Sequence, residues 1–146
     1  LAHLTASARA GRKPHVLTLA PPPTLDPRWY RDYVAYTIAK MGMSLAVIGH
    51  AEEFRPLGIA VNGLWPRTII DTAAVSQLPG VSIDRGRLRK PRIVGDAARA
   101  ILVRDPTGCT GRFFLDEEAL AEAGVHDLSA YAVEPGRPLL PDLFVD

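Results

Sequence analysis

A tyrosine and a lysine four residues apart, Tyr36 and Lys40, are the pair of side chains in this sequence best suited to proton transfer. On a helix, two residues at this spacing lie on the same face, one turn apart. A lysine ammonium near a phenol favours the phenolate and so lowers the tyrosine pKa. Because an unperturbed phenol stays protonated at neutral pH, the pair fits a tyrosine that acts as a general acid or base. The same spacing also occurs where a solvated lysine lies beside a packed tyrosine, so the surrounding sequence has to decide.

The pair falls in the longest helical pattern of the chain, residues 32–54, which Pro56 and Gly58 end. Apolar segments typical of buried strands lie at residues 15–20, 59–65 and 111–115, and shorter helices are predicted at residues 97–103 and 117–123. This alternation predicts an α/β fold, a partial Rossmann-type doubly wound parallel sheet of about three strands with flanking helices. We expect residues 1–146 to form a single unit in which residues 135–146 are an extended tail.

Three stretches around the pair match a family pattern: AYTIAKMGMS at residues 35–44, AEEFR at 51–55 and AVNGLWPRT at 60–68. They resemble the C-terminal half of the short-chain dehydrogenase/reductase family, in its hydroxysteroid-dehydrogenase-like branch. The resemblance continues through residues 110–116 and 138–144. It implies an oxidoreductase that transfers hydride between NAD or NADP and a small carbonyl or alcohol substrate. In that family the residue at Tyr36 exchanges a proton with the reacting oxygen, while the residue at Lys40 lowers the tyrosine pKa and holds the nicotinamide ribose.

Two other members of the family's catalytic set have no match in this sequence. The family's serine falls at Ala20, which has no hydroxyl, and Thr18 and Thr24 are the nearest substitutes. The family's asparagine would precede Leu1. These gaps favour a second hypothesis, a non-catalytic oligomerisation or scaffold fragment that has lost its active site.

The segment after the second strand is the candidate contact with the cofactor. The family has Pro-Gly there, followed by an apolar residue and a threonine that touch the nicotinamide. Here Arg67 follows Pro66, and Ile69 and Thr72 are the candidate contacts. The alternative is an ordinary turn from strand to helix.

The glycine-rich turn of a nucleotide-binding half is missing. Such a turn lets the backbone approach a pyrophosphate at a helix N-terminus. None of the 12 glycines is separated from another by a single residue, so G-x-G does not occur. We therefore expect NAD or NADP to bind in an intact parent protein, and neither to bind to this chain alone.

Apolar residues follow two stripes of the helix at residues 32–54, one made of Val34, Ile38, Met41, Leu45 and Ile48, the other of Tyr36, Met43, Val47, Ala51 and Phe54. One stripe can cover a sheet, and the other needs a second partner. We expect a homodimer or a higher homo-oligomer. A helix enclosed within one larger domain is the alternative.

The composition narrows the remaining classes of function. A net charge of +1 gives no general reason to expect nucleic acid or an anionic membrane as partner, and no apolar run reaches the ~20 residues of a membrane span. One cysteine, Cys109, excludes an internal disulfide and fits the cytoplasm. The four histidines are scattered, so no metal site is expected. Five basic residues within 85–92 fit either an acidic ligand or, more simply, a solvated loop.

Overall fold

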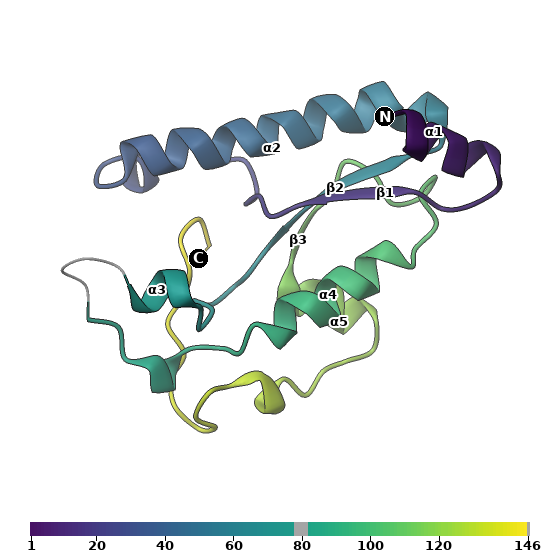
Figure 1. The fold of residues 1–146 in the computed structure, drawn as a ribbon. Coiled ribbons are helices and arrows are strands. Elements are labelled where there is room, and N and C mark those ends of the chain that lie inside the picture. Colours follow the sequence, from purple (N-terminus) through teal and green to yellow (C-terminus); the bar gives the residue numbers. More distant parts are fainter. Residues whose placement is uncertain (78–81, 146) are drawn as a thin grey trace.

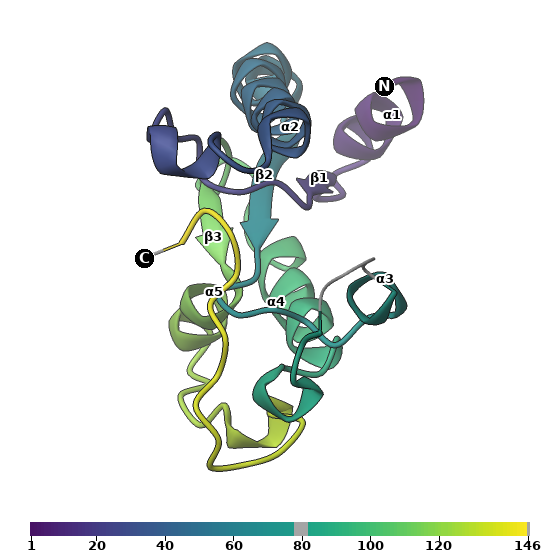
Figure 2. The ribbon, with the colours of Figure 1, turned by 90° about the vertical axis from the view of Figure 1, so that its left-hand side faces the viewer.

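The computed structural model describes residues 1–77 and 82–145. Three parallel strands form one sheet in the order β1 (His15–Thr18), β2 (Ala60–Trp65) and β3 (Phe113–Leu115). One face is covered by α2 (Val34–Phe54), with α1 (Ala2–Arg9) beside it, and the other by α4 (Arg92–Leu102) and α5 (Asp116–Glu122), as Figures 1 and 2 show. The predicted α/β class, a partial Rossmann-type parallel sheet, is confirmed.

Short helical turns connect these elements: α3 (Ala73–Ser76) and the 3-10 turns Pro27–Trp29, Arg55–Leu57, Arg85–Arg87 and Ser129–Tyr131. The turn after α2 ends at Gly58, whose φ of 69° lies in the left-handed region that glycine enters without a steric penalty.

Helix α2 faces the sheet through a single stripe made of Thr37, Met41, Ser44, Val47 and Ala51. Their spacing of three or four residues keeps them on one side of the helix. The pattern of apolar residues alone placed Met41 in the stripe of Val34 and Leu45, apart from Val47 and Ala51. That assignment was wrong because Thr37 and Ser44 belong to the buried face, where their hydroxyls donate to the carbonyls of Trp29 and Pro21.

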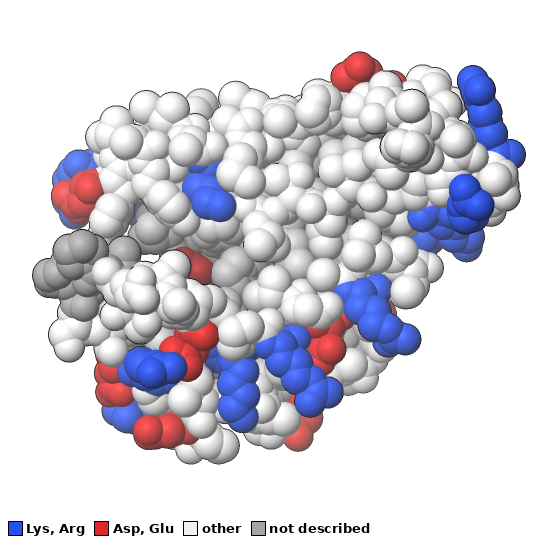
Figure 3. Space-filling view, viewed as in Figure 1, with Lys and Arg blue, Asp and Glu red and all other residues white. Residues whose placement is uncertain are grey.

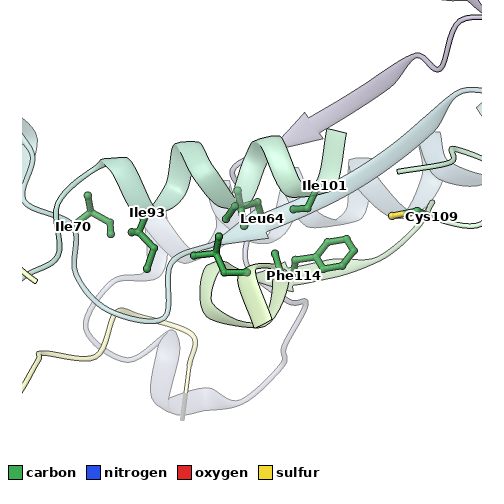
Figure 4. Packing of buried hydrophobic residues seen from close by; sticks show 9 residues of the cluster. Leu64, Ile70, Ile93, Ile101, Cys109 and Phe114 are labelled. Carbon is green, nitrogen blue, oxygen red and sulfur yellow. The ribbon is translucent and has the colours of Figure 1, made fainter. Parts of the chain in front are cut away.

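The core lies on both sides of β2, which is buried along its whole length, as expected for a parallel strand between two layers. Val61 packs toward α2 with Ala20, Val47 and Ala51. Leu64 packs on the other side in the largest cluster, shown in Figure 4, with Ile70, Ile93, Ala97, Ile101, Cys109, Phe114, Ala119 and Leu120. Helix α4 places three of these side chains, Ile93, Ala97 and Ile101, on its sheet-facing stripe.

Strands β1 and β3 are each two residues shorter than predicted, for local reasons. Strand β1 ends at Thr18 because the Ala20 amide folds back to donate to the Thr18 carbonyl over 2.8 Å, just before the prolines at 21–23. Strand β3 begins only at Phe113, since the Asn62 side chain accepts the Arg112 amide and Gly111 has a φ of 74°.

The basic side chains of residues 85–92 are engaged within the chain. Arg85 forms a bidentate pair with Asp71, Arg89 pairs with Glu117 over 2.6 Å, and Arg92 pairs with Asp96. Arg87 and Lys90 donate to the carbonyls of Pro138 and Ala130. These contacts favour a structural role for the cluster over a phosphate site. In Figure 3 basic and acidic side chains lie next to one another over the lower part of the molecule, while the surface over α2 is mostly uncharged.

Candidate functional site

Tyr36 and Lys40 lie at the edge of the sheet where the parallel strands end. The Lys40 ammonium donates to the carbonyl of Leu19, just after β1, over 3.1 Å. Its nitrogen also lies 5.0 Å from the ring centroid of Trp65, the last residue of β2. Ligands of open α/β sheets bind beyond the carboxyl ends of the strands. The helix therefore brings the predicted pair to the position in the fold where such proteins do chemistry.

The Tyr36 ring lies beside Lys40, whose ammonium lies over the ring and forms no hydrogen bond with the Tyr36 hydroxyl. The Lys40 nitrogen is 6.0 Å from the Tyr36 ring centroid. Tyr36 is 44% exposed, so a substrate can reach the phenol.

A segment near the end of the chain, residues 139–145, packs against this pair, and we refer to it as the strap. The Trp65 indole N–H donates to the Leu143 carbonyl over 2.7 Å. Backbone bonds from the Ile69 amide to the Leu140 carbonyl and from the Asp142 amide to the Arg67 carbonyl, both 3.0 Å, tie the strap to the segment after β2. The strap carries Phe144 into a cluster with Met41, Trp65, Leu115 and Val145.

Phe144 is the centre of an aromatic cluster at the site. Its ring centroid lies 5.7 Å from Trp29, 5.8 Å from Trp65 and 6.2 Å from Tyr36. The contact with Tyr36 is stacked, with 16° between the planes. Thus three segments far apart in sequence meet around Phe144, which stacks on the candidate acid/base.

The electrostatics of the pair differ from the sequence prediction. Burial raises the pKa of Tyr36, and the Asp142 carboxylate raises it further. Burial lowers the pKa of Lys40, which Asp142 partly offsets. The lowering of the tyrosine pKa expected from Lys40 is therefore not seen, because burial and the Asp142 carboxylate both act in the opposite direction.

Asp142 is itself perturbed. Burial raises the pKa of its carboxyl from 3.8 to about 6, although the Leu143 amide, which donates to the carboxylate, opposes the shift. Asp116 at the start of α5 raises the Asp142 pKa by repulsion, and Lys40 lowers it by attraction. The Asp116 pKa is also raised by burial, against the amides of Arg67 and Glu117 that donate to it.

The serine position lies away from the aromatic cluster. Ala20 is completely buried and packs with Val47, Ala51 and Val61. Of the substitute hydroxyls, Thr18 lies within β1, and Thr24 accepts the Asp26 amide in the following loop. The structure brings Tyr36 and Lys40 together but shows no contact between Tyr36 and Ala20, Thr18 or Thr24.

The candidate cofactor contacts are spread along the segment after β2. Pro66 follows Trp65 directly. The Ile69 amide donates to the strap and its carbonyl accepts the Arg89 amide, while the Thr72 hydroxyl caps α3 by accepting the Val75 amide over 3.3 Å. Arg67 takes the place of the family's glycine and pairs with Glu117 and Glu118 of α5.

The residues present fit only the nicotinamide ribose end of a dinucleotide. An ammonium has three N–H donors, and the bond to Leu19 uses one of them, so Lys40 can also donate to ribose hydroxyls. Nothing in the sequence supplies a G-x-G turn for the pyrophosphate. Among the described residues no helix is long and apolar enough to cross a membrane, and no cluster of three metal-ligating side chains occurs.

Sequence reasoning missed three residues of the site: Trp65, Asp142 and Phe144. The apolar positions of the tail, including Phe144, indicated that it needs a surface on which to dock. No local feature of the sequence indicated which surface this is, since Asp142 and Phe144 lie about a hundred residues along the chain from Tyr36 and Lys40.

Known proteins share both this sequence and this fold. A protein of Xanthomonas campestris described as a dehydrogenase is 55% identical, with a TM-score of 0.85 over 92% of this chain and 48% of its own. A short chain dehydrogenase from Mycobacterium thermoresistibile is 45% identical, with a TM-score of 0.82 over 98% of this chain and 53% of its own. This chain is a relative of the short-chain dehydrogenases.

Curated proteins named for the branch that the motifs indicated are also similar to this chain. Hydroxysteroid dehydrogenase-like protein 2 of Danio rerio is 52% identical over 135 residues, and the human protein of that name is 48% identical over 132 residues. The chain spans about a third of the length of these relatives, 32% and 31%. No protein-family model matches it. The resemblance to the C-terminal half of a short-chain dehydrogenase is confirmed.

Proposed function

We propose that this chain supplies the proton-transfer half of an NAD(P)-dependent short-chain dehydrogenase/reductase that acts on a carbonyl or alcohol. The proposal rests chiefly on the position of Tyr36 and Lys40 beyond the carboxyl ends of β1 and β2. The dehydrogenases among its relatives support the class of reaction.

In this proposal Tyr36 holds the proton that is exchanged with the substrate oxygen. Its exposed phenol is accessible to a substrate, and its raised pKa keeps the proton on the phenol at neutral pH, as carbonyl reduction requires. Lys40 orients the ribose of the cofactor and brings positive charge to the site. The cofactor supplies hydride when it is bound.

The fully buried Ala20 favours a second candidate function. Without a hydroxyl there, the site lacks a donor to the substrate oxygen at the position of the family's serine. A non-catalytic oligomerisation or scaffold protein would keep the sheet and α2 and lose turnover.

Assembly is common to both functions. Four apolar side chains on the outer face of α2 are between 44% and 65% exposed: Val34, Ile38, Leu45 and Ile48. We propose that this face pairs with a second copy of the chain in a homodimer or higher homo-oligomer, since an isologous contact buries the same face on both partners.

The deciding experiment compares wild type with Tyr36→Phe in a full-length dehydrogenase domain that contains this chain. A panel of ketones and aldehydes is assayed with NADH and NADPH. The enzymatic proposal expects turnover by the wild type and a fall in kcat of at least about a hundredfold in Tyr36→Phe. The exposed Tyr33→Phe is the matched control and should keep full activity. No turnover by any of the three proteins would support the scaffold function. Equal turnover by all three would show that Tyr36 is not the acid/base.

A further inference from the structure

Phe144 has an unusual backbone for its residue type. It is the one non-glycine residue in the described part of the chain with a positive φ, at 68°. A bulky side chain in this left-handed region is costly and persists only where the surroundings impose it. The surroundings here are the aromatic rings at the candidate reaction site.

The strap holds Phe144 firmly in this conformation. On one side of Phe144 the Leu143 carbonyl accepts the Trp65 indole N–H, and Pro141 bridges to Thr68 in antiparallel fashion. On its other side Val145 is buried in the same cluster. Phe144 is only 7% exposed, so its ring is enclosed by protein and does not itself face a substrate.

The ring of Tyr36 has few other constraints. Tyr36 lies in the first turn of α2, which begins at Val34, and it is 44% exposed. Lys40 lies 6.0 Å from its ring centroid, and Phe144 stacks on the ring with 16° between the planes. The stacked face therefore defines the plane in which the phenol oxygen lies.

We propose that Phe144 is a positioning residue that sets the ring of Tyr36 for proton transfer. The inference rests on the proposed function of Tyr36 and deepens it. A misplacement of about 1 Å at a reacting group can cost roughly a hundredfold in rate. Phe144 thus acts through Tyr36 without touching the reacting atoms.

The first test uses this chain alone and does not depend on activity. Both tryptophans of the sequence, Trp29 and Trp65, contact the Phe144 ring, so their emission reports whether the strap is docked. Tyr36 is followed by NMR of ¹³C-labelled tyrosine through a pH titration. We expect Phe144→Leu to shift the emission to the red and to lower the raised pKa of Tyr36, because the phenol loses the ring that buries it.

The matched control is Phe114→Leu, the same change at a fully buried phenylalanine in the core cluster around Leu64. It lowers stability but should leave both signals unchanged while the chain is folded. Phe144→Tyr keeps an aromatic face and should restore the Tyr36 titration. If Phe144→Leu and Phe114→Leu give the same Tyr36 titration, the positioning role is overturned.

The second test measures kcat and KM in the full-length domain. Phe144→Leu should lower kcat by about ten- to a hundredfold with little change in KM, and Phe144→Tyr should recover most of the loss. Tyr36→Phe separates the two proposals. If it abolishes turnover while Phe144→Leu leaves kcat unchanged, only the positioning role fails. If Tyr36→Phe has no effect, the proposed function fails, and the titration on the chain alone still decides whether Phe144 sets the Tyr36 ring.

Discussion

Ser44 donates a hydrogen bond from its hydroxyl to the carbonyl oxygen of Pro21 over 2.7 Å, and both residues are fully buried. The bond fixes the loop after β1 to the middle of α2, and so fixes the distance between Leu19 and Lys40. A buried carbonyl that loses its donor keeps the full cost of its desolvation.

We therefore expect Ser44→Ala to lower the free energy of unfolding by about 1–3 kcal/mol. Urea unfolding followed by tryptophan emission measures this. Ser76→Ala removes a similar hydroxyl-to-carbonyl bond, to Ala73, on an exposed turn, and should change stability by less than about 0.5 kcal/mol. Equal losses of unfolding free energy in the two variants would show that burial of the Pro21 carbonyl does not determine the cost of losing the hydrogen bond.

The raised pKa of Asp142 predicts a pH-dependent stability. The folded state binds the proton more tightly than the unfolded state, so stability falls as pH rises from about 4 to about 6 and is constant above. Asp142→Asn removes this loss and should stabilise the chain at pH 7 by up to about 3 kcal/mol, with a gain that shrinks toward pH 4. Unfolding at several pH values tests the slope. Asp127→Asn is the control, because the Ser129 amide lowers the pKa of that carboxyl and the sign is opposite.

Ala20→Ser tests the assignment of the missing hydroxyl. A single preorganised donor to a developing oxyanion is worth roughly 3–4 kcal/mol, so we expect turnover by the full-length domain to rise by about a hundredfold or more. The added gain should vanish in the double variant with Tyr36→Phe. A loss of stability without any gain in turnover would mean that the new hydroxyl points into the core with Val47 and Ala51, and Thr24 would be the next candidate.

Assembly through α2 is tested at its outer face. Leu45→Lys places a charge in the proposed interface and should raise the dimer dissociation constant at least about tenfold. Light scattering across a dilution series gives the mass. Val103→Lys changes an equally exposed apolar residue at the end of α4 and should leave the mass unchanged. A wild-type chain that is monomeric at every concentration contradicts the interface.

We expect cofactor binding to distinguish this chain from a complete dehydrogenase domain. We expect NADH and NADPH to leave the emission of Trp29 and Trp65 unchanged at micromolar concentrations with the chain alone. The same titration on the full-length domain should show saturable quenching. A micromolar dissociation constant for the isolated chain would mean that the pyrophosphate is held without a glycine-rich turn.

Much of the fold could be predicted because its signals are local. The end of α2 follows from Pro56 and Gly58, and the burial of β2 follows from its uninterrupted apolar run. The start of α4 was predicted too late, at residue 97, because the basic residues before it resembled a loop. In the structure the helix begins at Arg92, directly after Pro91.

The site could be predicted only in part, since its electrostatics depend on distant segments. The spacing of Tyr36 and Lys40 fixed their common face but not the direction of their pKa shifts. Those shifts depend on burial and on Asp142, which reaches the site only because the strap binds along the segment after β2. No local pattern places residue 142 beside residue 40.

Strand β1 pairs with β2 on one side, and no strand among the described residues pairs with its other side. The unpaired N–H and C=O groups of His15–Thr18 form a template for another strand. We therefore expect this edge to accept a further strand. A separately produced glycine-rich half that adds its strand along β1 would complete the sheet, and association of the pieces would itself be the last step of folding.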